Sequence, residues 1–158
     1  MTTRQRTAIG ALVLSAATLV GIATHEAYRG DAYLPTPNDV PTIGWGTTEG
    51  VRLGDKTDPT RALIRLLADA GKYERAVKRC ADMPMFQHEF NAYVSLAYNI
   101  GEAAFCSSTL VRKLRMGDYA GACREILRWD RQAGKVLRGL TIRRQSEYRQ
   151  CMGEEAAK

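Results

Sequence analysis

The chain has 158 residues, of which 45% are hydrophobic and 25% charged, a composition that fits one globular domain or a small two-lobed one. Its formal net charge of +6 favours an anionic partner such as nucleic acid, a membrane surface or the bacterial wall, although a solvated basic surface explains the charge as well. We expect no nucleic-acid partner, because the sequence has no zinc-finger spacing, no aromatic RNA-binding motif and no long Lys/Arg run.

The first expected element is an apolar export segment. It follows Arg4 and Arg6, begins at Ala8 and ends at Thr24, and has 17 residues without a charge. This length is near the lower limit for crossing a bilayer, and ten of the 17 residues are Ala, Gly, Ser or Thr. The segment therefore predicts a weakly held transmembrane helix whose positive N-terminus stays in the cytoplasm. A cleaved signal peptide is the alternative.

A small antiparallel sheet is expected next, in the turn-rich residues 30–58, where residues 40–46 alternate like a strand that ends in a turn. Asp58 and Pro59 then provide a helix N-cap and a proline at the first helical position. Helical spacing of apolar residues continues from there to about Cys80.

The remainder of the chain is predicted to be helical. A core helix over residues 86–100 is apolar around most of its circumference and stops at Gly101. Three further helices are predicted, each from its capping residues and spacing. They run from Ser107 or Ser108 to Met116, from Asp118 to Trp129, and from about Thr141 to Cys151, with a Gly-containing connection over residues 130–139.

The cysteines indicate disulfides. An even number together with an export segment favours two bridges, for which three connectivities are possible. No C-x-x-C pair occurs and the sequence has only two histidines, so we expect neither a metal site nor a Cys–His catalytic pair. The residues concerned are Cys80, Cys106, Cys123 and Cys151, and the histidines His25 and His88.

One carboxylic acid has a position that suits catalysis. Glu26 lies two residues beyond the apolar segment and directly before the turn-rich region. Glycoside hydrolysis requires a carboxylic acid that is protonated near neutral pH and a second polar group that positions water. A Glu at a helix end, facing a cleft between a sheet lobe and a helical lobe, fits the first role, but from spacing alone a solvated Glu is the favoured interpretation.

Further motifs surround and follow Glu26 in order, at residues 25–29, 32–33, 40–48, 86–87, 90–92, 95–101, 105–110, 117–119, 129, 139–140, 143–144 and 147. In these segments the sequence resembles the phage-type lysozymes, the endolysins of tailed phages in glycoside hydrolase family 24. The resemblance covers about residues 25–152. It implies an α+β, lysozyme-like, two-lobed domain that cleaves the β-1,4 bond between N-acetylmuramic acid and N-acetylglucosamine of peptidoglycan, with inversion and without a cofactor. We also expect a monomer.

The resemblance implies roles for individual residues. Glu26 corresponds to the acid, and Thr42 to a threonine that helps to position the attacking water. In the family an Asp lies six positions before that threonine, but Thr36 occupies this place here, and Glu26 and Thr42 are one position further apart than usual. We favour Asp39, in the same loop, as the assisting carboxylate over Asp31, although a solvated turn Asp is the competing interpretation.

Three more side chains are weaker candidates for substrate binding. Trp45 either stacks on a sugar or packs in its hairpin, Asn99 borders the cleft, and Arg143 contacts the wall. For Arg143 and its neighbour Arg144 a solvated helix face is the favoured alternative. Aligned on the family's motifs, the cysteines pair as Cys80–Cys106 and Cys123–Cys151.

The resemblance extends to family members with a signal-arrest-release segment, which exports the enzyme, holds it in the membrane and later leaves the bilayer uncleaved. It predicts three regions: the signal anchor (residues 1–24), the catalytic domain (25–152) and a polar tail (153–158). The protein would face the periplasm from the host inner membrane and then be released there. A lytic transglycosylase and a catalytically silent wall-binding protein remain the alternatives.

Overall fold

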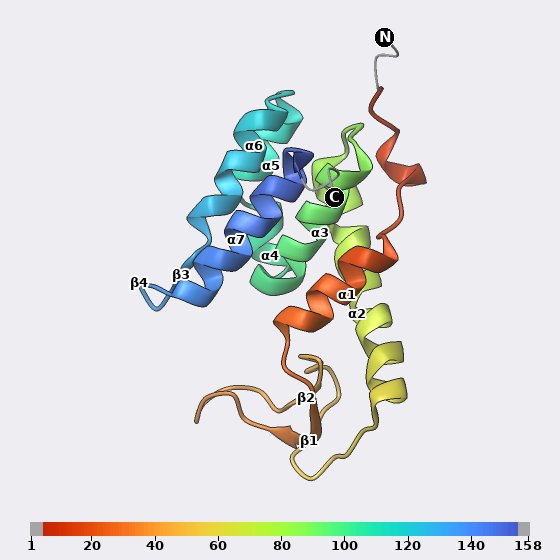
Figure 1. Ribbon diagram of the computed structural model, residues 1–158, viewed down its shortest axis with the longest axis vertical. Coiled ribbons are helices and arrows are strands. Elements are labelled where there is room, and N and C mark those ends of the chain that lie inside the picture. Colours follow the sequence, from red (N-terminus) through yellow and green to blue (C-terminus); the bar gives the residue numbers. More distant parts are fainter. Residues whose placement is uncertain (1–4, 155–158) are drawn as a thin grey trace. The chain divides into compact units, whose positions relative to one another are not determined.

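The computed structural model describes residues 5–154 and divides the chain into two compact units (Figure 1). The first unit combines the residues up to Thr18 with those from Tyr73 onward, and the second comprises Leu19–Lys72. Residues that precede position 5, Arg4 among them, and most of the predicted polar tail lie outside the described part of the chain.

The apolar N-terminal run is not a single helix in the structure. It forms a 3-10 turn η1 (Ile9–Ala11), an extended residue Leu12, and the helix α1 (Ala16–His25). The break has a local cause, because the Oγ of Ser15 accepts a hydrogen bond from the backbone N–H of Thr18 at 3.2 Å and so caps a new helix. Within residues 5–154, no helix has both the length and the apolar character needed to cross a membrane.

The Leu19–Lys72 unit contains the predicted sheet. Strands β1 (Arg29–Tyr33) and β2 (Thr42–Gly44) pair antiparallel with an irregularity between their two matched positions. The helix α2 (Pro59–Ala81) begins as expected, since the Asp58 Oδ1 accepts a hydrogen bond from the N–H of Arg61 at 2.9 Å. The sheet is short and is continued by single bridges, one of which joins Ile43 to Thr47.

The other unit is built around α3 (Gln87–Ile100), whose residues 89–97 are all buried. Figure 1 shows α7 (Arg138–Cys151) beside α3, the pair with the most extensive contact between helices. The predicted stop at Gly101 is confirmed, with φ +89°, as are the side-chain caps at Ser108 and Asp118. The remaining helices are α4 (Glu102–Cys106), α5 (Thr109–Arg115), α6 (Tyr119–Glu125) and the 3-10 turn η2 (Ile126–Arg128).

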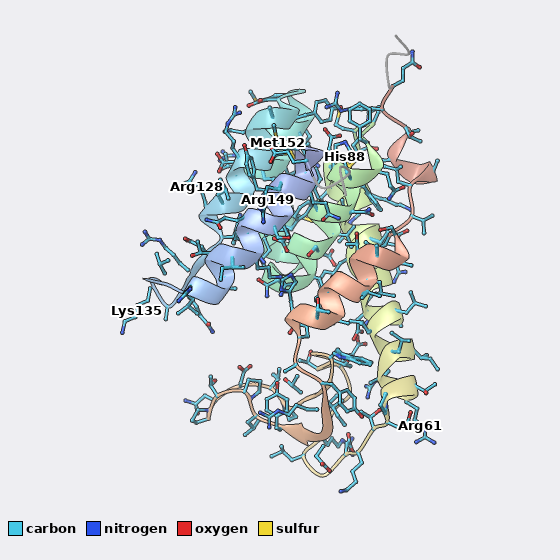
Figure 2. All side chains as sticks on the ribbon, viewed as in Figure 1. Arg61, His88, Arg128, Lys135, Arg149 and Met152 are labelled. Atoms are coloured by element: carbon cyan, nitrogen blue, oxygen red, sulfur yellow. A yellow bond between two sulfur atoms is a disulfide. The ribbon has the colours of Figure 1, made fainter. Side chains whose placement is uncertain are left out.

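The connection over residues 130–139 is more ordered than predicted. Strands β3 (Arg131–Gln132) and β4 (Lys135–Val136) form a hairpin there, and Figure 2 labels Lys135 at its end. Ala133 and Gly134 both have positive φ, +48° and +77°, as a two-residue hairpin turn of the primed type requires. As a consequence α7 starts at Arg138, three residues before its predicted beginning.

Two disulfides cross-link the helices of the helical unit. Cys80 is joined to Cys106 and Cys123 to Cys151, the pairs expected from the resemblance, with S–S distances of 1.97 and 1.98 Å. They connect α2 to α4 and α6 to α7. Each closes a loop of 26 or 28 residues, which the chain-entropy model values at about 3 kcal/mol.

Candidate active site

The Glu26 carboxyl lies against a hairpin of the Leu19–Lys72 unit. Its backbone N–H still donates to the Ile22 carbonyl at 3.2 Å, so α1 positions the residue at its C-terminal end. The side chain is half-buried, and a Cβ placed on Gly46 would lie 3.3 Å from the Glu26 Oε2. Gly46 has φ +86°, which favours glycine, and the missing side chain lets the carboxyl approach the hairpin backbone closely.

The hairpin that faces Glu26 is held by its own backbone and by α2. The N–H groups of Ile43 and Thr47 donate to each other's carbonyls at 2.9 and 3.1 Å. The buried Thr47 hydroxyl also donates to the Asp69 carboxylate of α2 at 2.7 Å. Sequence reasoning missed Asp69, because its position on a helix does not distinguish a carboxylate that holds a hairpin from a solvated one.

Thr42 belongs to the same hairpin and is only 6% exposed. Its Oγ1 donates to the Val40 carbonyl at 3.1 Å. With its proton engaged in that bond, the hydroxyl oxygen still has lone pairs that can accept a hydrogen bond from water. Thr42 is therefore oriented as an acceptor, the arrangement that a residue holding a nucleophilic water needs.

The two candidate aspartates have different surroundings. Asp39 is exposed, and its oxygens accept from the Val40 N–H at 2.9 Å and from the Thr36 hydroxyl at 3.4 Å, so the side chain closes its own loop. Asp31 forms an ion pair with Lys56 at 2.9 Å, in which both side chains are more than three-quarters exposed. Neither geometry by itself makes a carboxylate a catalytic group.

Trp45 lies in the hairpin turn and packs on Tyr28, with ring centroids 5.1 Å apart and planes inclined by 53°. The Tyr28 hydroxyl donates to the Thr57 carbonyl at 3.2 Å, which fixes the partner ring. The packed-hairpin interpretation of Trp45 thus has direct support, and its half-buried state leaves part of the indole accessible.

Arg143 and Arg144 are buried in the helical unit, at 5% and 0% exposure, so the favoured prediction of a solvated face is wrong. Both pair with Glu147, at 3.3 and 3.0 Å, and Glu147 accepts a further bond from the Ser95 hydroxyl at 2.7 Å. Burial raises the pKa of the Glu147 carboxyl and lowers that of the Arg144 guanidinium to about 10, and the opposite charges offset part of each effect.

Asn99 lies at a cavity of the same unit. Its Oδ1 accepts a hydrogen bond from the Arg144 guanidinium at 3.0 Å, so the buried ion pairs determine how the amide is turned. The cavity measures about 340 Å³ and combines an indole, a guanidinium and two amides. Its lining residues are Asn99, Ile100, Trp129, Arg131, Gln132 and Leu140. Within the described residues, no group of three His, Cys, Asp or Glu side chains could hold a metal ion.

Comparison with known proteins identifies the family. The family model of phage lysozymes matches residues 23–147, a range that contains Glu26, Thr42, Asn99 and Arg143. The chain belongs to the phage lysozyme family. The SAR-endolysin of Pseudomonas phage phiKMV is 31% identical over 141 residues, which cover 87% of each chain.

Solved structures agree with this assignment. The endolysin from Escherichia coli O157:H7 phage FAHEc1 superposes with a TM-score of 0.78 at 32% identity, covering 90% of this lysozyme and 95% of that chain. The muramidase domain of SpmX from Asticcacaulis excentricus gives a TM-score of 0.82 at 29% identity, with coverages of 89% and 98%. This phage lysozyme of the SAR-endolysin subgroup is a glycoside hydrolase whose substrate is bacterial peptidoglycan.

Proposed function

We propose that this enzyme lyses the phage host by hydrolysing the β-1,4 bond between N-acetylmuramic acid and N-acetylglucosamine, with Glu26 as the general acid. The observation that carries the assignment is the close approach of the Glu26 carboxyl to Gly46, in the hairpin that also contains Thr42. A carboxyl and a hydroxyl acceptor on one small scaffold are the two groups that the reaction needs.

In this mechanism Glu26 protonates the leaving glycosidic oxygen. The Thr42 hydroxyl oxygen accepts one hydrogen of a water, whose lone pair attacks the anomeric carbon from the opposite face, so that the configuration inverts. As the new C–O bond forms, the water keeps one hydrogen as the product hydroxyl and releases the other to solvent, and Glu26 regains its proton from solvent before the next cycle. Because the Thr42 hydroxyl donates its hydrogen to the Val40 carbonyl, it can only accept a hydrogen bond from that water. The water is then turned with a hydrogen toward Thr42 and a lone pair toward the sugar.

Asp39 assists through Val40. Its carboxylate accepts from the Val40 N–H, and the carbonyl of the same residue accepts from Thr42. The aspartate thereby holds the backbone of Val40, the residue whose carbonyl orients the Thr42 hydroxyl. Asn99, Arg143 and Trp45 remain proposals for substrate binding, of which Asn99 has the most direct support because it lines a cavity.

Product analysis tests the reaction. Mass spectrometry of muropeptides released from purified walls should find a reducing N-acetylmuramic acid, because water is added. An anhydro sugar would instead identify a lytic transglycosylase, and walls that remain turbid with bound protein would identify a silent wall-binding protein.

We further propose that residues 8–24 act as a signal-arrest-release segment and that residues 25–152 form the catalytic region, followed by the tail from residue 153. Support comes from the 17 uncharged residues, from their small average size, and from the subgroup of the related endolysins. The membrane potential favours the inserted orientation of the positive N-terminus, so its collapse is the expected trigger of release to the periplasm.

Fractionation before and after addition of an uncoupler tests this step. Full-length protein should move from the inner membrane to the soluble periplasm while wall-degrading activity rises. Leucine at Gly10, Ala16 and Gly21 should trap the protein in the membrane. A Cβ at either glycine meets no atom within 4 Å and Ala16 is exposed, so these changes add no clash near the backbone. Soluble protein beginning near Thr24 would mean ordinary signal cleavage.

A further inference from the structure

Residues 6–15, the N-terminal segment, are an integral part of the folded helical unit. The N–H of Thr7 donates to the Met85 carbonyl at 3.0 Å, and the N–H of Met85 donates back at 2.9 Å. Ile9 and Leu12, at 8% and 5% exposure, belong to the same hydrophobic core as Phe90 of α3. Two of the large apolar residues that would face lipid in an inserted segment are therefore covered by protein in this state, whereas Val13, which follows Leu12, is 64% exposed.

Side chains of the unit also satisfy the backbone of this segment. The Leu14 N–H donates to the Glu74 carboxylate at 2.9 Å, and the Val13 carbonyl accepts from the Gln87 amide at 2.7 Å. The buried Asn91 accepts from the Ser15 N–H at 3.2 Å. An irregular segment is thus given polar partners along its length, which a non-specific apolar contact would not provide.

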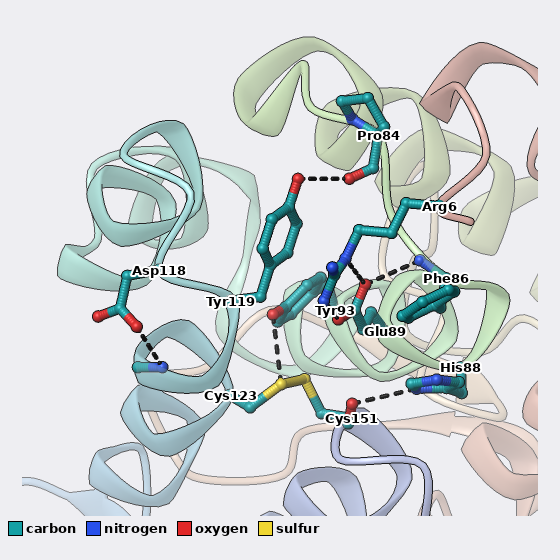
Figure 3. Close-up of polar contacts among 11 residues, drawn as sticks. Arg6, Pro84, Phe86, His88, Glu89, Tyr93, Asp118, Tyr119, Cys123 and Cys151 are labelled. Atoms are coloured by element: carbon teal, nitrogen blue, oxygen red, sulfur yellow. Dashed lines mark hydrogen bonds and ion pairs between the residues drawn. A yellow bond between two sulfur atoms is a disulfide. The ribbon is translucent and has the colours of Figure 1, made fainter. Parts of the chain in front are cut away.

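At the start of the N-terminal segment, the guanidinium of Arg6 lies in a site formed by one carboxylate and two aromatic rings. It binds both oxygens of Glu89, Nη2 to Oε1 at 2.8 Å and Nε to Oε2 at 3.1 Å (Figure 3). The guanidinium carbon lies 3.6 Å from the centre of the Tyr119 ring and 4.5 Å from that of Phe86. The Tyr119 hydroxyl donates to the Pro84 carbonyl at 2.7 Å, which fixes the aromatic wall.

Glu89 depends on this guanidinium more than Arg6 depends on Glu89. The glutamate side chain is 4% exposed, whereas that of Arg6 is 32% exposed. The Glu89 carboxylate also accepts a hydrogen bond from the Phe86 N–H at 2.8 Å, at the start of α3. A carboxylate in this position would be left poorly neutralised if Arg6 were withdrawn, and burying an unpaired charge is costly.

We propose that Glu89, Phe86 and Tyr119 form a guanidinium socket which captures Arg6 and locks the N-terminal segment on the helical unit after it leaves the membrane. The inference rests on the proposed release step. Arg6 lies two residues before the apolar run, so insertion of the run places this charge on the cytoplasmic side and leaves the socket empty. The same charge therefore has two mutually exclusive positions, and occupation of the socket opposes reinsertion.

Hydrogen exchange of the soluble full-length protein tests the lock at the Thr7 and Met85 amides. Arg6→Gln and Glu89→Gln should each accelerate exchange at both amides by at least about tenfold, which corresponds to about 1.4 kcal/mol. The Glu89→Gln variant can retain the hydrogen bond from the Phe86 N–H, since the Gln amide oxygen also accepts at this position. The double variant should exchange no faster than the single ones, because they remove the same interaction.

Two variants separate the socket from charge alone. Arg4→Gln removes an equal charge from the same basic start and should leave exchange at Thr7 unchanged. Arg6→Lys keeps the charge but loses the bidentate and stacked geometry, so it should fall between native and Arg6→Gln. Equal acceleration by Arg4→Gln, or additive effects in the double variant, would overturn the proposal.

Sedimentation with vesicles of phosphatidylethanolamine and phosphatidylglycerol tests whether the socket opposes membrane binding. After mixing, the Glu89→Gln protein, whose N-terminal charge is unchanged, should sediment with vesicles in a larger fraction than the native protein. Equal sedimentation would contradict a role in opposing reinsertion. Muropeptide release measured on the same samples keeps the questions apart, because a lack of hydrolysis by native protein would reject the proposed function and leave the exchange result standing.

Discussion

Asp39 and Asp31 both follow the proposed acid in the sequence, but we propose that only Asp39 supports Thr42, through Val40. Asp39→Asn keeps an acceptor for the Val40 N–H and weakens it, so wall hydrolysis should fall by about tenfold, the equivalent of one weakened charged hydrogen bond. Asp31→Asn removes an exposed ion pair with Lys56 and should change activity little. Initial rates on purified walls provide the measurement. A larger loss for Asp31→Asn would show that Asp31 is the assisting carboxylate.

Thr47 and Asp69 give a second prediction at this scale. Thr47→Val preserves shape and removes the donor to Asp69, so unfolding free energy should fall by about 1.5–3 kcal/mol, and kcat should fall because the hairpin facing Glu26 is less firmly held. Thr47→Ser should recover most of both. The neighbouring Thr48 is exposed, and Thr48→Val serves as the control. An unchanged kcat in Thr47→Val would show that the hydrogen bond to Asp69 does not help to position the hairpin for catalysis.

At the scale of helices, a buried ion pair and an exposed one contribute different amounts to the free energy of unfolding. Glu147→Gln leaves Arg143 and Arg144 buried without their carboxylate, which should cost about 3–5 kcal/mol in denaturant unfolding with the disulfides intact. Glu102→Gln removes the exposed partner of Arg79 and should stay within about 1 kcal/mol. Similar losses in the two variants would contradict the structural role given to Glu147.

The contact between α5 and α6 has a pH signature. Lys113 donates to Glu125 at 2.9 Å and holds the pKa of that carboxyl below its usual 4.5, with Arg128 acting in the same direction and burial opposing. A lowered carboxyl pKa stabilises the fold above the unfolded value, and this stability is lost as the pH falls through the folded pKa. The Tm of Glu125→Gln should therefore lie below native at pH 7 and converge with it in acid. A constant difference down to the acid limit would exclude this cause.

Elements with local signals were predictable from the sequence. Asp58, Ser108 and Asp118 cap helices where expected, because a cap is a hydrogen bond between near neighbours in the chain. The β3–β4 hairpin was missed, since its turn uses Ala133 before Gly134 in place of the usual Asn or Asp. The burial of Arg143 and Arg144 depends on packing against α3, and only the spacing of Glu147, three and four residues on, pointed to it.

For the whole molecule, the apolar run shows the limit of reading a sequence. Its composition predicts a membrane segment, while the structure gives the same residues a 3-10 turn, an extended residue and a short helix with polar partners. A segment that enters the membrane in one state and packs on the protein in another must suit both environments. Its composition indicates only the membrane. Glu26 and Thr42 were proposed from their order in the chain, whereas Asp69 and the Arg6 socket required long-range contacts.

The central claim, that Glu26 is the acid of a peptidoglycan hydrolase, is tested most directly by the muropeptides that Glu26→Gln releases. The variant should remain folded and bind walls, and its release of products with a reducing N-acetylmuramic acid should fall by about 10²–10⁴-fold relative to the native enzyme, the usual contribution of general acid catalysis. Release at more than about a tenth of the native rate would contradict the assignment, since that loss is smaller than removal of a general acid produces.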